Sequence, residues 1–598
     1  MTTQKYTVNQ YFVETILAWV QGGEIAIPEI QRPFVWKSSK VRDLMDSLYN
    51  GYPIGYLITW RNPDVKLKDG SSSEGKKVLI DGQQRITAMM AAILGKSVIN
   101  EDYKKIKIKI AFHPIKKKFE VVNPAILKDV SWIPDIAPII TGNARYFEVV
   151  NNYLEKNPEA NRKLCEDSLD NLKQVMKKQL GLIELVPNLD IEVVNEVFIR
   201  INSQGVALSQ ADFAMSKIAV NEKHGGPLLR KCIDYFCHLA VAPEFYPTIK
   251  NNDSEFSSTE YFQKVSWLKD ENDDLYDPDY KDLIRVAFTY KFNRGKLSAL
   301  VSLLSGRNFE TRTYEDEIAK ESFGKLKKGV LDFISETNFK RFAMIIKSAG
   351  FIHRSQVRSQ NTLNFAYILY LKLRSLNYDQ SKIEHYVKRW FVLSILTGRY
   401  SASPESSFDF DIKSISKRDF EEFLHDVESA ELSDAFWNAS LIQSLNTSVA
   451  SSPFFNVYLA AQVKLKDLGF LSNDITVNDL ISHRGDIHHI FPRDYLKKNG
   501  LKRGQYNQIA NYVYMQSEIN IKVGKKAPEE YFSELNQQCQ SGGLKYGGIC
   551  DLNKLNENLA MNCVPKEIFS MSIKDYEKFL ELRRKLIAEK IKKYYFSL

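Results

Sequence analysis

The chain is poor in cysteine and has no long apolar runs. Its six cysteines are scattered over 598 residues without a CxxC pair, which is typical of reduced, mostly buried thiols and not of a disulfide scaffold. No apolar stretch approaches the roughly 18 residues needed to cross a bilayer. The N-terminus lacks the basic segment and apolar run of a secretory signal. We therefore expect a cytoplasmic protein with no membrane segment.

The composition is that of an ordinary globular protein with a modest excess of positive charge. Hydrophobic residues make up 44% of the chain and charged residues 26%, so several full cores can form. At about 100–200 residues per domain, the length predicts three to four folding units. The net charge of +9 permits nucleic-acid binding but does not require it.

Three regions differ in their sequence pattern. Residues 1–225 alternate short strands, turns and helices, residues 226–440 are helical, and residues 441–598 carry a histidine cluster. In the first region, residues 104–112 (KKIKIKIAF) alternate strictly and predict one half-exposed strand. In the second, residues 361–376 repeat apolar side chains at three-to-four spacing and predict a helix. The predicted fold is therefore α+β with several domains, and we place their boundaries near residues 225 and 440.

The chain ends on a predicted amphipathic helix that is rich in basic residues, over residues 574–595. Two interpretations stay open for this helix. It packs on the protein and leaves its basic face in water, or that face contacts the backbone of DNA.

A strand, a polar turn and a helix follow one another in residues 78–95 (VLIDGQQRITAMMAAILG). The turn begins at Asp81, and Arg85 is expected to open a helix that runs to about Leu94, with Gly95 as its C-cap. Free N–H groups and the helix dipole favour a phosphate at such a helix start, and Arg85 adds a bidentate donor. Asp81 could hold a metal or orient a water molecule. The alternative is a surface turn with an ordinary helix cap.

Three further segments accompany this motif. Residues 27–36 (IPEIQRPFVW) form an extended stretch, residues 38–60 predict a helix, a Gly-Pro turn and a strand, and residues 198–213 (FIRINSQGVALSQADF) predict two helices. The second of those helices is expected to start at Ser209, with Asp212 in a capping-box position.

Together these segments resemble the DUF262 domain, a relative of the ParB/sulfiredoxin fold. The family shows an IPxxQRxxxW segment, a DGQQR motif and a later FxRxNxxG segment, and all three occur here in that order. The resemblance implies binding and hydrolysis of a nucleoside triphosphate, with GTP, UTP and ATP all open. It also implies which residues line the pocket, although Arg32 could equally be a structural ion-pair partner: Gln31, Arg32, Asp81, Gly82, Gln83, Gln84, Arg85 and Asn202.

Three of the nine histidines fall within seven residues, at His483, His488 and His489. Hydrolysis of a phosphodiester needs a base for water and a cation that stabilises the charge of the transition state. An imidazole suits the base, and a second imidazole with amide oxygens and waters can hold Mg²⁺ or Mn²⁺. His483 lies on the preceding turn and is expected to be structural or exposed.

The segments around this cluster predict a ββα unit. Residues 487–490 predict a strand that Pro492 ends, and residues 511–515 predict the returning strand. Ser517 is expected to cap a short helix that carries Asn520 in its first turn.

The pattern from His488 to Asn520 resembles the HNH nucleases, specifically the DUF1524 branch. The resemblance implies that His489 is the general base, that His488 and Asn520 are metal ligands, and that Asn511 braces the loop and orients His489. Lys522 and Lys525 would contact phosphate. Many HNH sequences have Asp in place of His488, so a neutral ligand here favours Mn²⁺ or softer ions unless Asp486 supplies the carboxylate.

DUF262 followed by DUF1524 is the architecture of GmrSD-like type IV restriction enzymes and related phage-defence nucleases. It implies cleavage of modified double-stranded DNA, with the helical middle region as a hypothetical transmitter of nucleotide state to the nuclease. A homodimer is possible, because a single-site nuclease would then cut both strands. Two alternatives stay open: a nucleotide-switched DNA-binding regulator with a silent nuclease, and an RNA-directed nuclease of abortive infection.

Overall fold

The protein is a mostly helical α+β chain with a small mixed sheet near its N-terminus. The computed structural model describes residues 4–26, 36–61, 77–99, 105–187, 189, 209–271, 273, 275–483 and 485–598. The chain divides into two compact units: Met1–Asp270 with Leu297–Lys327, and Glu271–Lys296 with Lys328–Leu598. Within the described ranges, no helix is long and apolar enough to cross a membrane.

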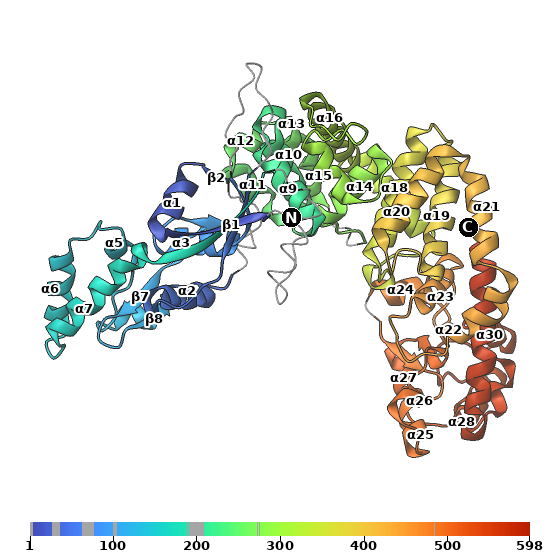
Figure 1. Cartoon of the computed structure of the whole chain (residues 1–598). Coiled ribbons are helices and arrows are strands. Elements are labelled where there is room, and N and C mark those ends of the chain that lie inside the picture. The colour runs from blue at the N-terminus through green and yellow to red at the C-terminus, as the bar shows by residue number, and fades with distance from the viewer. Residues whose placement is uncertain are drawn as a thin grey trace. The chain divides into compact units, whose positions relative to one another are not determined.

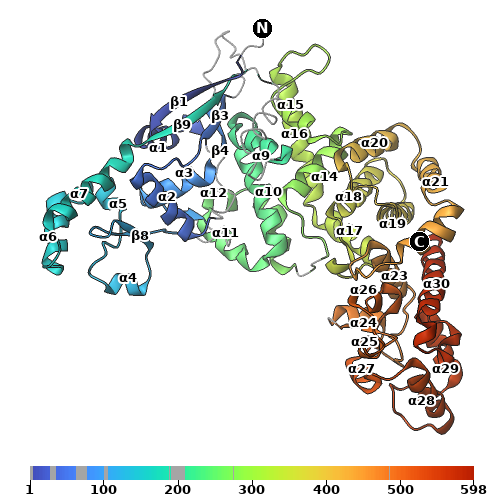
Figure 2. The ribbon, with the colours of Figure 1, turned by 60° about the horizontal axis from the view of Figure 1, so that its bottom comes forward.

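The first unit is built around a five-stranded sheet in the order β1-β9-β3-β4-β2. Strand β1 runs antiparallel to β9, β3 runs parallel to β9 and antiparallel to β4, and β2 runs parallel to β4. The longer strands lie side by side in Figure 2. The strands are β1 (Tyr6–Phe12), β2 (Ile25–Ala26), β3 (Leu57–Arg61), β4 (Lys77–Asp81) and β9 (Gln179–Leu185).

Helices of the first unit cover this sheet or extend from it (Figure 1). Helices α1, α2 and α3 bury their apolar faces in one core with Leu57, Leu79 and Leu182. This unit also contains the predicted helix after Ser209, where Ser209 and Asp212 form the capping box. Its helices are α1 (Val13–Gln21), α2 (Ser38–Asn50), α3 (Gln83–Ala92), α4 (Pro124–Lys128), α5 (Ala137–Ile140), α6 (Tyr146–Lys156), α7 (Arg162–Lys173), α9 (Gln210–Val220), α10 (Gly226–Val241), α11 (Tyr246–Asn252), α12 (Ser254–Ser257), α13 (Glu260–Val265) and α15 (Leu297–Leu304), and α16 (Asp316–Phe333) continues into the second unit.

The single strand predicted over residues 104–112 is wrong. The described part of this segment forms β6 (Lys105–Ile106), which pairs with β5 (Val98–Ile99), and β7 (Ile110–His113), which pairs with β8 (Lys118–Val121). All four residues of β7 are buried, and the rings of Phe112 and Phe119 pack on Tyr49 of α2. The strand breaks because its two halves pair with different partners.

The second unit begins with a layer of apolar helices. The helix predicted over residues 361–376 is confirmed as α18 (Gln360–Ser375), most of whose residues are buried. Arg399 has a structural role in this layer. Its Nε donates to Asp411 Oδ2 at 2.8 Å and its Nη2 donates to Asp411 Oδ1 at 2.5 Å, and the Asp411 carboxylate is buried. The helices of this layer are α14 (Tyr280–Phe292), α17 (Glu336–Ser348), α18, α19 (Gln380–Thr397), α20 (Pro404–Lys417) and α21 (Phe420–Glu431).

The C-terminal half of the second unit contains a short hairpin surrounded by helices. Strands β10 (Ile487–His489) and β11 (Tyr512–Tyr514) form the hairpin, and the apolar core beside it includes Ile490, Phe491 and Val513. The surrounding helices are α22 (Leu441–Ser444), α23 (Pro453–Lys464), α24 (Val477–Ser482), α25 (Arg493–Lys498), α26 (Arg503–Tyr506), α27 (Ser517–Val523), α28 (Pro528–Ser541), α29 (Leu552–Met561) and α30 (Tyr576–Phe596).

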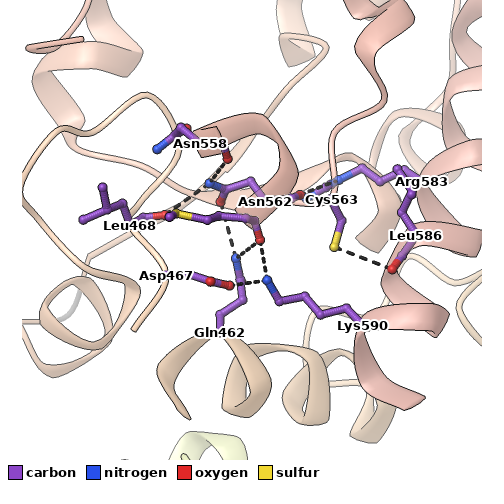
Figure 3. A network of polar contacts seen from close by, with 10 residues as sticks. Gln462, Asp467, Leu468, Asn558, Asn562, Cys563, Arg583, Leu586 and Lys590 are labelled. Carbon is purple, nitrogen blue, oxygen red and sulfur yellow. Dashed lines mark hydrogen bonds and ion pairs between the residues drawn. The ribbon is translucent and has the colours of Figure 1, made fainter. Parts of the chain in front are cut away.

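The predicted C-terminal helix is confirmed as α30, and a buried polar network holds it in the second unit (Figure 3). Arg583 is fully buried and donates to the carbonyl oxygens of Asn562 at 3.1 Å and Ala510 at 2.9 Å. Lys590 forms an ion pair with the buried Asp467. Two basic residues of this helix therefore serve packing.

Candidate functional site

The hairpin of β10 and β11 carries the two adjacent histidines. His488 pairs with Val513 and His489 with Tyr512 in the antiparallel register. Because neighbours along a strand point to opposite faces, the two imidazoles leave β10 on different sides. Their surroundings differ accordingly.

The ring of His489 is held on two sides. Its Nε2 lies 3.1 Å from the amide oxygen Oδ1 of Asn507, and its ring meets Tyr512 edge-on with centroids 5.1 Å apart. Burial lowers the pKa of His489 below its ordinary value, against the opposing effect of the Asn507 hydrogen bond; Arg493 and His488 lower it further. The environment therefore favours the neutral imidazole, which can accept a proton.

His488 has a buried ring nitrogen that is available to a ligand. Its Nε2 has no hydrogen-bond partner among the described residues. Burial lowers the pKa of His488, and the nearby Asp486 carboxylate partly offsets this. A buried, unpartnered nitrogen on a neutral imidazole fits the donor that a divalent cation requires.

Asn511 braces the turn that follows β10. Its Oδ1 accepts from the Phe491 backbone N–H at 2.8 Å, and its Nδ2 donates to the Phe491 carbonyl at 3.0 Å. The Asn511 carbonyl also accepts from the Ile490 N–H at 2.9 Å. Asn511 thus contacts the backbone beyond His489, while the ring itself is contacted by Asn507.

Side chains from α28 and α30 donate hydrogen bonds to the backbone on either side of the hairpin strands. The Tyr531 hydroxyl donates to the Ile490 carbonyl at 2.9 Å, and the Tyr576 hydroxyl donates to the Gln505 carbonyl at 3.0 Å. Arg583 donates to Ala510, the residue before Asn511. The C-terminal helices therefore fix the backbone of this site.

Helix α27 follows the hairpin and carries Asn520, which is half-buried. The prediction that Ser517 caps this helix is wrong. Gln516 is the N-cap residue, and Ser517 is the first helical residue. The Gln516 side chain accepts from the Ser472 hydroxyl at 3.0 Å, a long-range contact that the local sequence does not reveal. Lys522 and Lys525 are exposed.

His483 lies outside this arrangement, as predicted. It is exposed, and its Nδ1 contacts the Asp479 carbonyl at 2.8 Å. Over the ranges that the structure describes, no group of three or more His, Cys, Asp or Glu side chains is placed to hold a metal ion. A cation at His488 would therefore depend on amide oxygens and water as well.

The DGQQR motif joins β4 to α3 through a glycine that no other residue can replace without strain. Gly82 has φ +98°, and a Cβ there would lie 2.3 Å from Leu57 Cδ2. The helix begins at Gln83 and not at Arg85, and its C-cap is Ile93, with Gly95 two residues further in the left-handed region. The expected start and C-cap of this helix are therefore corrected.

Arg85 folds back onto the turn. Its Nη2 donates to Asp81 Oδ2 at 2.8 Å and its Nη1 to the Tyr56 carbonyl at 2.6 Å. Gly55 makes room for the guanidinium, because a Cβ at Gly55 would lie 3.0 Å from Nη1. The Gln83 amide donates weakly to the Leu79 carbonyl at 3.5 Å. Gln84 is half-buried one residue further on.

Three residues of the predicted nucleotide pocket, Gln31, Arg32 and Asn202, lie outside the described residues. The five from Asp81 to Arg85 lie together at the end of β4.

Comparison with known proteins identifies this part of the chain. Residues 13–219 match the family model described as "GmrSD restriction endonuclease, N-terminal domain". This segment is a GmrSD N-terminal domain. The family is named for a restriction endonuclease, so the GmrSD domain suggests a nuclease whose substrate is DNA. The chain is also 22% identical to the uncharacterized protein MJ0686 of Methanocaldococcus jannaschii, over 95% of this chain and 96% of that protein.

Sequence reasoning missed two contacts of these sites. The first is the contact of Asn507 with His489. Asn507 stands four residues before Asn511, and its side-chain amide was the feature of the sequence that could have suggested this contact. Tyr56 contributes a backbone carbonyl to Arg85, for which a sequence gives no signal.

Proposed function

We propose that the chain is a nucleotide-regulated, metal-dependent endonuclease of the HNH type that cleaves modified foreign DNA. The observation that carries the proposal is the β10–β11–α27 unit, with a buried unpartnered His488 Nε2 on one face of the strand and the His489 ring held by Asn507 on the other. The GmrSD N-terminal domain supports a restriction function for the whole chain.

His489 is the general base in this proposal. The Asn507 oxygen can only accept, so the His489 Nε2 carries the proton of the hydrogen bond. The Nδ1 lone pair is then free to take a proton from a water molecule that attacks the phosphodiester. Asn507 is a positioning residue, because it sets the ring orientation and the tautomer without touching the substrate.

His488 and Asn520 would hold the divalent cation, Mg²⁺ or Mn²⁺. A bound cation supplies charge stabilisation for the phosphorane-like transition state and the departing 3′ oxygen. The donors are an imidazole nitrogen and an amide oxygen, both neutral, which favours Mn²⁺ over the harder Mg²⁺. Asn511 keeps the Phe491 backbone, and with it the end of β10, in place.

The GmrSD domain binds a nucleoside triphosphate at the turn from Asp81 to Arg85 in this proposal, within a ParB-like fold. The start of α3 offers free N–H groups to phosphate. Arg85 has five N–H donors, and its contacts to Asp81 and Tyr56 engage two of them, so others can reach a phosphate. Gln31, Arg32, Gln83, Gln84 and Asn202 complete the proposed pocket.

The substrate is tested by incubating the protein with Mn²⁺ or Mg²⁺ and three DNAs: one glucosylated, one phosphorothioated and one unmodified. The expected result is cutting of one modified DNA, dependent on the cation and stimulated or restrained by nucleotide. Cutting of all three DNAs at one rate would remove the modification dependence. Cutting of RNA alone would replace the proposal with an RNA-directed nuclease, and DNA binding without cutting would indicate a regulator.

A further inference from the structure

A shallow basic groove lies in the second unit, on elements other than the histidine hairpin. Its cavity of about 440 Å³ is formed by one face of α20 and by the loop that follows α14. The lining residues are Lys296, Ser406, Asp409, Phe410, Lys413, Ser414 and Lys417.

Local sequence explains how the groove forms. Ser406, Phe410, Lys413 and Lys417 recur at three-to-four spacing and so share one face of α20. The loop reaches that face through Gly295, where a Cβ would lie 2.2 Å from the Asp409 backbone nitrogen. Only a glycine allows this close approach.

Asp409 fixes the loop against the helix. Its Oδ1 accepts from the Gly295 N–H at 2.9 Å, and its Oδ2 accepts from Lys413 Nζ at 2.5 Å. Burial alone would raise the pKa of Asp409, but Lys413, the Gly295 N–H and Lys296 together lower it. The carboxylate stays ionised, pairs with Lys413 and fixes the loop at Gly295, the residue before Lys296.

The remaining acidic residues of α20 do not cancel the charge of the groove. Glu405 lies 3.5 Å from Arg285, and Asp411 is bound by Arg399. Lys296 and Lys417 are exposed, and neither forms an ion pair with another described residue. Three lysines therefore face one carboxylate in the groove.

An exposed aromatic ring also lines the groove. Phe410 is 61% exposed, although a phenyl ring gains about 2 kcal/mol from burial. Two serine hydroxyls complete the lining. Cationic side chains, hydroxyls and an exposed ring are the groups that bind a phosphodiester backbone together with its sugars or bases.

We propose that this groove binds the backbone of DNA, through phosphate contacts from Lys296 and Lys417 and contact of Phe410 with a sugar or base. The inference rests on the proposed function only in taking DNA as the substrate. The groove adds affinity without sequence information, because phosphate contacts do not distinguish bases.

The test measures DNA binding by the full chain in EDTA over a series of salt concentrations. The double variant Lys296→Gln/Lys417→Gln keeps the Asp409–Lys413 pair. Each lost phosphate contact lowers the slope of log affinity against log salt by about 1. We therefore expect a slope lower by about 2 and an affinity roughly 10-fold weaker. The matched control Lys325→Gln/Lys340→Gln removes two exposed lysines that pair with Glu321 and Glu336, and it should bind as the wild type does.

The outcomes separate the groove from the nuclease. If the Lys296→Gln/Lys417→Gln variant has the wild-type salt slope and the wild-type affinity for DNA, the proposal that the groove binds DNA is overturned. A loss of triphosphate binding with DNA binding intact would also overturn it, since the groove would then serve the nucleotide. If the wild type binds DNA with the expected difference between variants but never cuts it, the proposed function fails while the groove stands.

Discussion

His488 and His489 are adjacent residues whose rings lie in different surroundings: the His489 Nε2 contacts Asn507, and the His488 Nε2 has no hydrogen-bond partner among the described residues. The sequence pattern singled out the two histidines, and the resemblance to HNH nucleases implied that Asn511 orients His489. In the structure, Asn511 contacts the Phe491 backbone, and the ring contact comes from Asn507. Spacing cannot distinguish two nearby amides, because the choice depends on how the backbone turns before β11.

The contact between Asn507 and His489 predicts different effects on cleavage for two substitutions of Asn507. Asn507→Asp keeps an oxygen that accepts from Nε2–H, so the tautomer is retained and cleavage stays within about threefold of the wild type. Asn507→Leu removes the acceptor, and cleavage should fall about 10–100-fold, the usual effect of losing a contact that orients a site residue. The nitrogen chemical shifts of the His489 ring report its tautomer, and they distinguish a change of tautomer from a loss of folded protein.

A matched control is Asn499→Leu, which removes an exposed amide whose side-chain hydrogen bond, in the part of the chain that the structure describes, is to the Tyr495 carbonyl of the preceding helix. It should leave both the shifts and the cleavage rate unchanged. Equal losses in Asn507→Asp and Asn507→Leu would contradict the assigned role of the Asn507 oxygen.

Glu534 predicts a pH-dependent contribution to stability. Burial would raise its pKa, but hydrogen bonds from Lys526, Lys545 and Tyr546 lower the pKa to about 2. Because the folded-state pKa lies below the unfolded value, the stabilisation is present above about pH 4.5 and is lost as the pH falls towards 2. The side chain is 24% exposed, so solvent screening reduces the contribution to about 1–2 kcal/mol.

We expect Glu534→Gln to lower the free energy of unfolding by about 1–2 kcal/mol at pH 7. The difference in stability between this variant and the wild type should shrink below pH 4.5. Urea unfolding at several pH values measures it. Glu557→Gln, at an exposed position, should change stability by less than about 0.5 kcal/mol at every pH. A Glu534→Gln difference that grows with acidity would refute the sign of the linkage.

At the scale of elements, the sequence predicted best where its pattern matched the final packing. Helix α18 and the capping box of α9 followed from apolar spacing and from Ser209 with Asp212. The alternation of residues 104–112 led to the wrong prediction of one continuous strand, because the two halves of this segment pair with different strands. The prediction that Ser517 caps α27 was also wrong. Gln516 is the N-cap residue, and its side chain contacts Ser472, which is 44 residues away in the sequence. Long-range pairing decides such cases, and a local pattern does not contain it.

The turn between β4 and α3 predicts a graded effect of alanine at glycine positions. Gly82 and Gly142 both have positive φ, but only Gly82 has a close neighbour, at Leu57. A left-handed residue with a Cβ costs about 1–2 kcal/mol. Gly142→Ala should lose about that amount, and Gly82→Ala should lose roughly 1–2 kcal/mol more, because the Leu57 side chain must move.

Denaturant unfolding of the two glycine variants, followed by probes in the first unit, gives the comparison. Equal losses in both variants would mean that the Leu57 contact has no energetic consequence.

At the scale of the whole molecule, the predicted boundaries near residues 225 and 440 remain predictions. The compact units group the helices differently: α9–α13 and α15 belong to the unit with the sheet, while α14 and α17–α21 belong to the unit with the hairpin. Helical periodicity is the same in both groups. Only the pairing of apolar faces assigns a helix to a unit, and the sequence does not reveal that pairing.

Regulation by nucleotide predicts that the rate of DNA cleavage depends on what the GmrSD domain binds. A nucleotide can shift a conformational equilibrium only if its affinity differs between the two states. We therefore expect different cleavage rates with no nucleotide, with triphosphate and with diphosphate, and Arg85→Ala should reduce that difference. Identical rates under all three conditions would exclude the coupling while leaving the nuclease proposal intact.

The central claim is that the β10–β11–α27 unit cleaves DNA with His489 as its base. The most direct test is single-turnover cleavage of a susceptible DNA in Mn²⁺ by wild type, His489→Ala and His483→Ala. His483 is exposed, and its one hydrogen bond from the side chain within the described ranges is to the Asp479 carbonyl, so its variant controls for loss of a nearby histidine. The account predicts a loss of about 100-fold or more in His489→Ala and a rate within about twofold of wild type in His483→Ala. Cleavage by His489→Ala at the wild-type rate would contradict it.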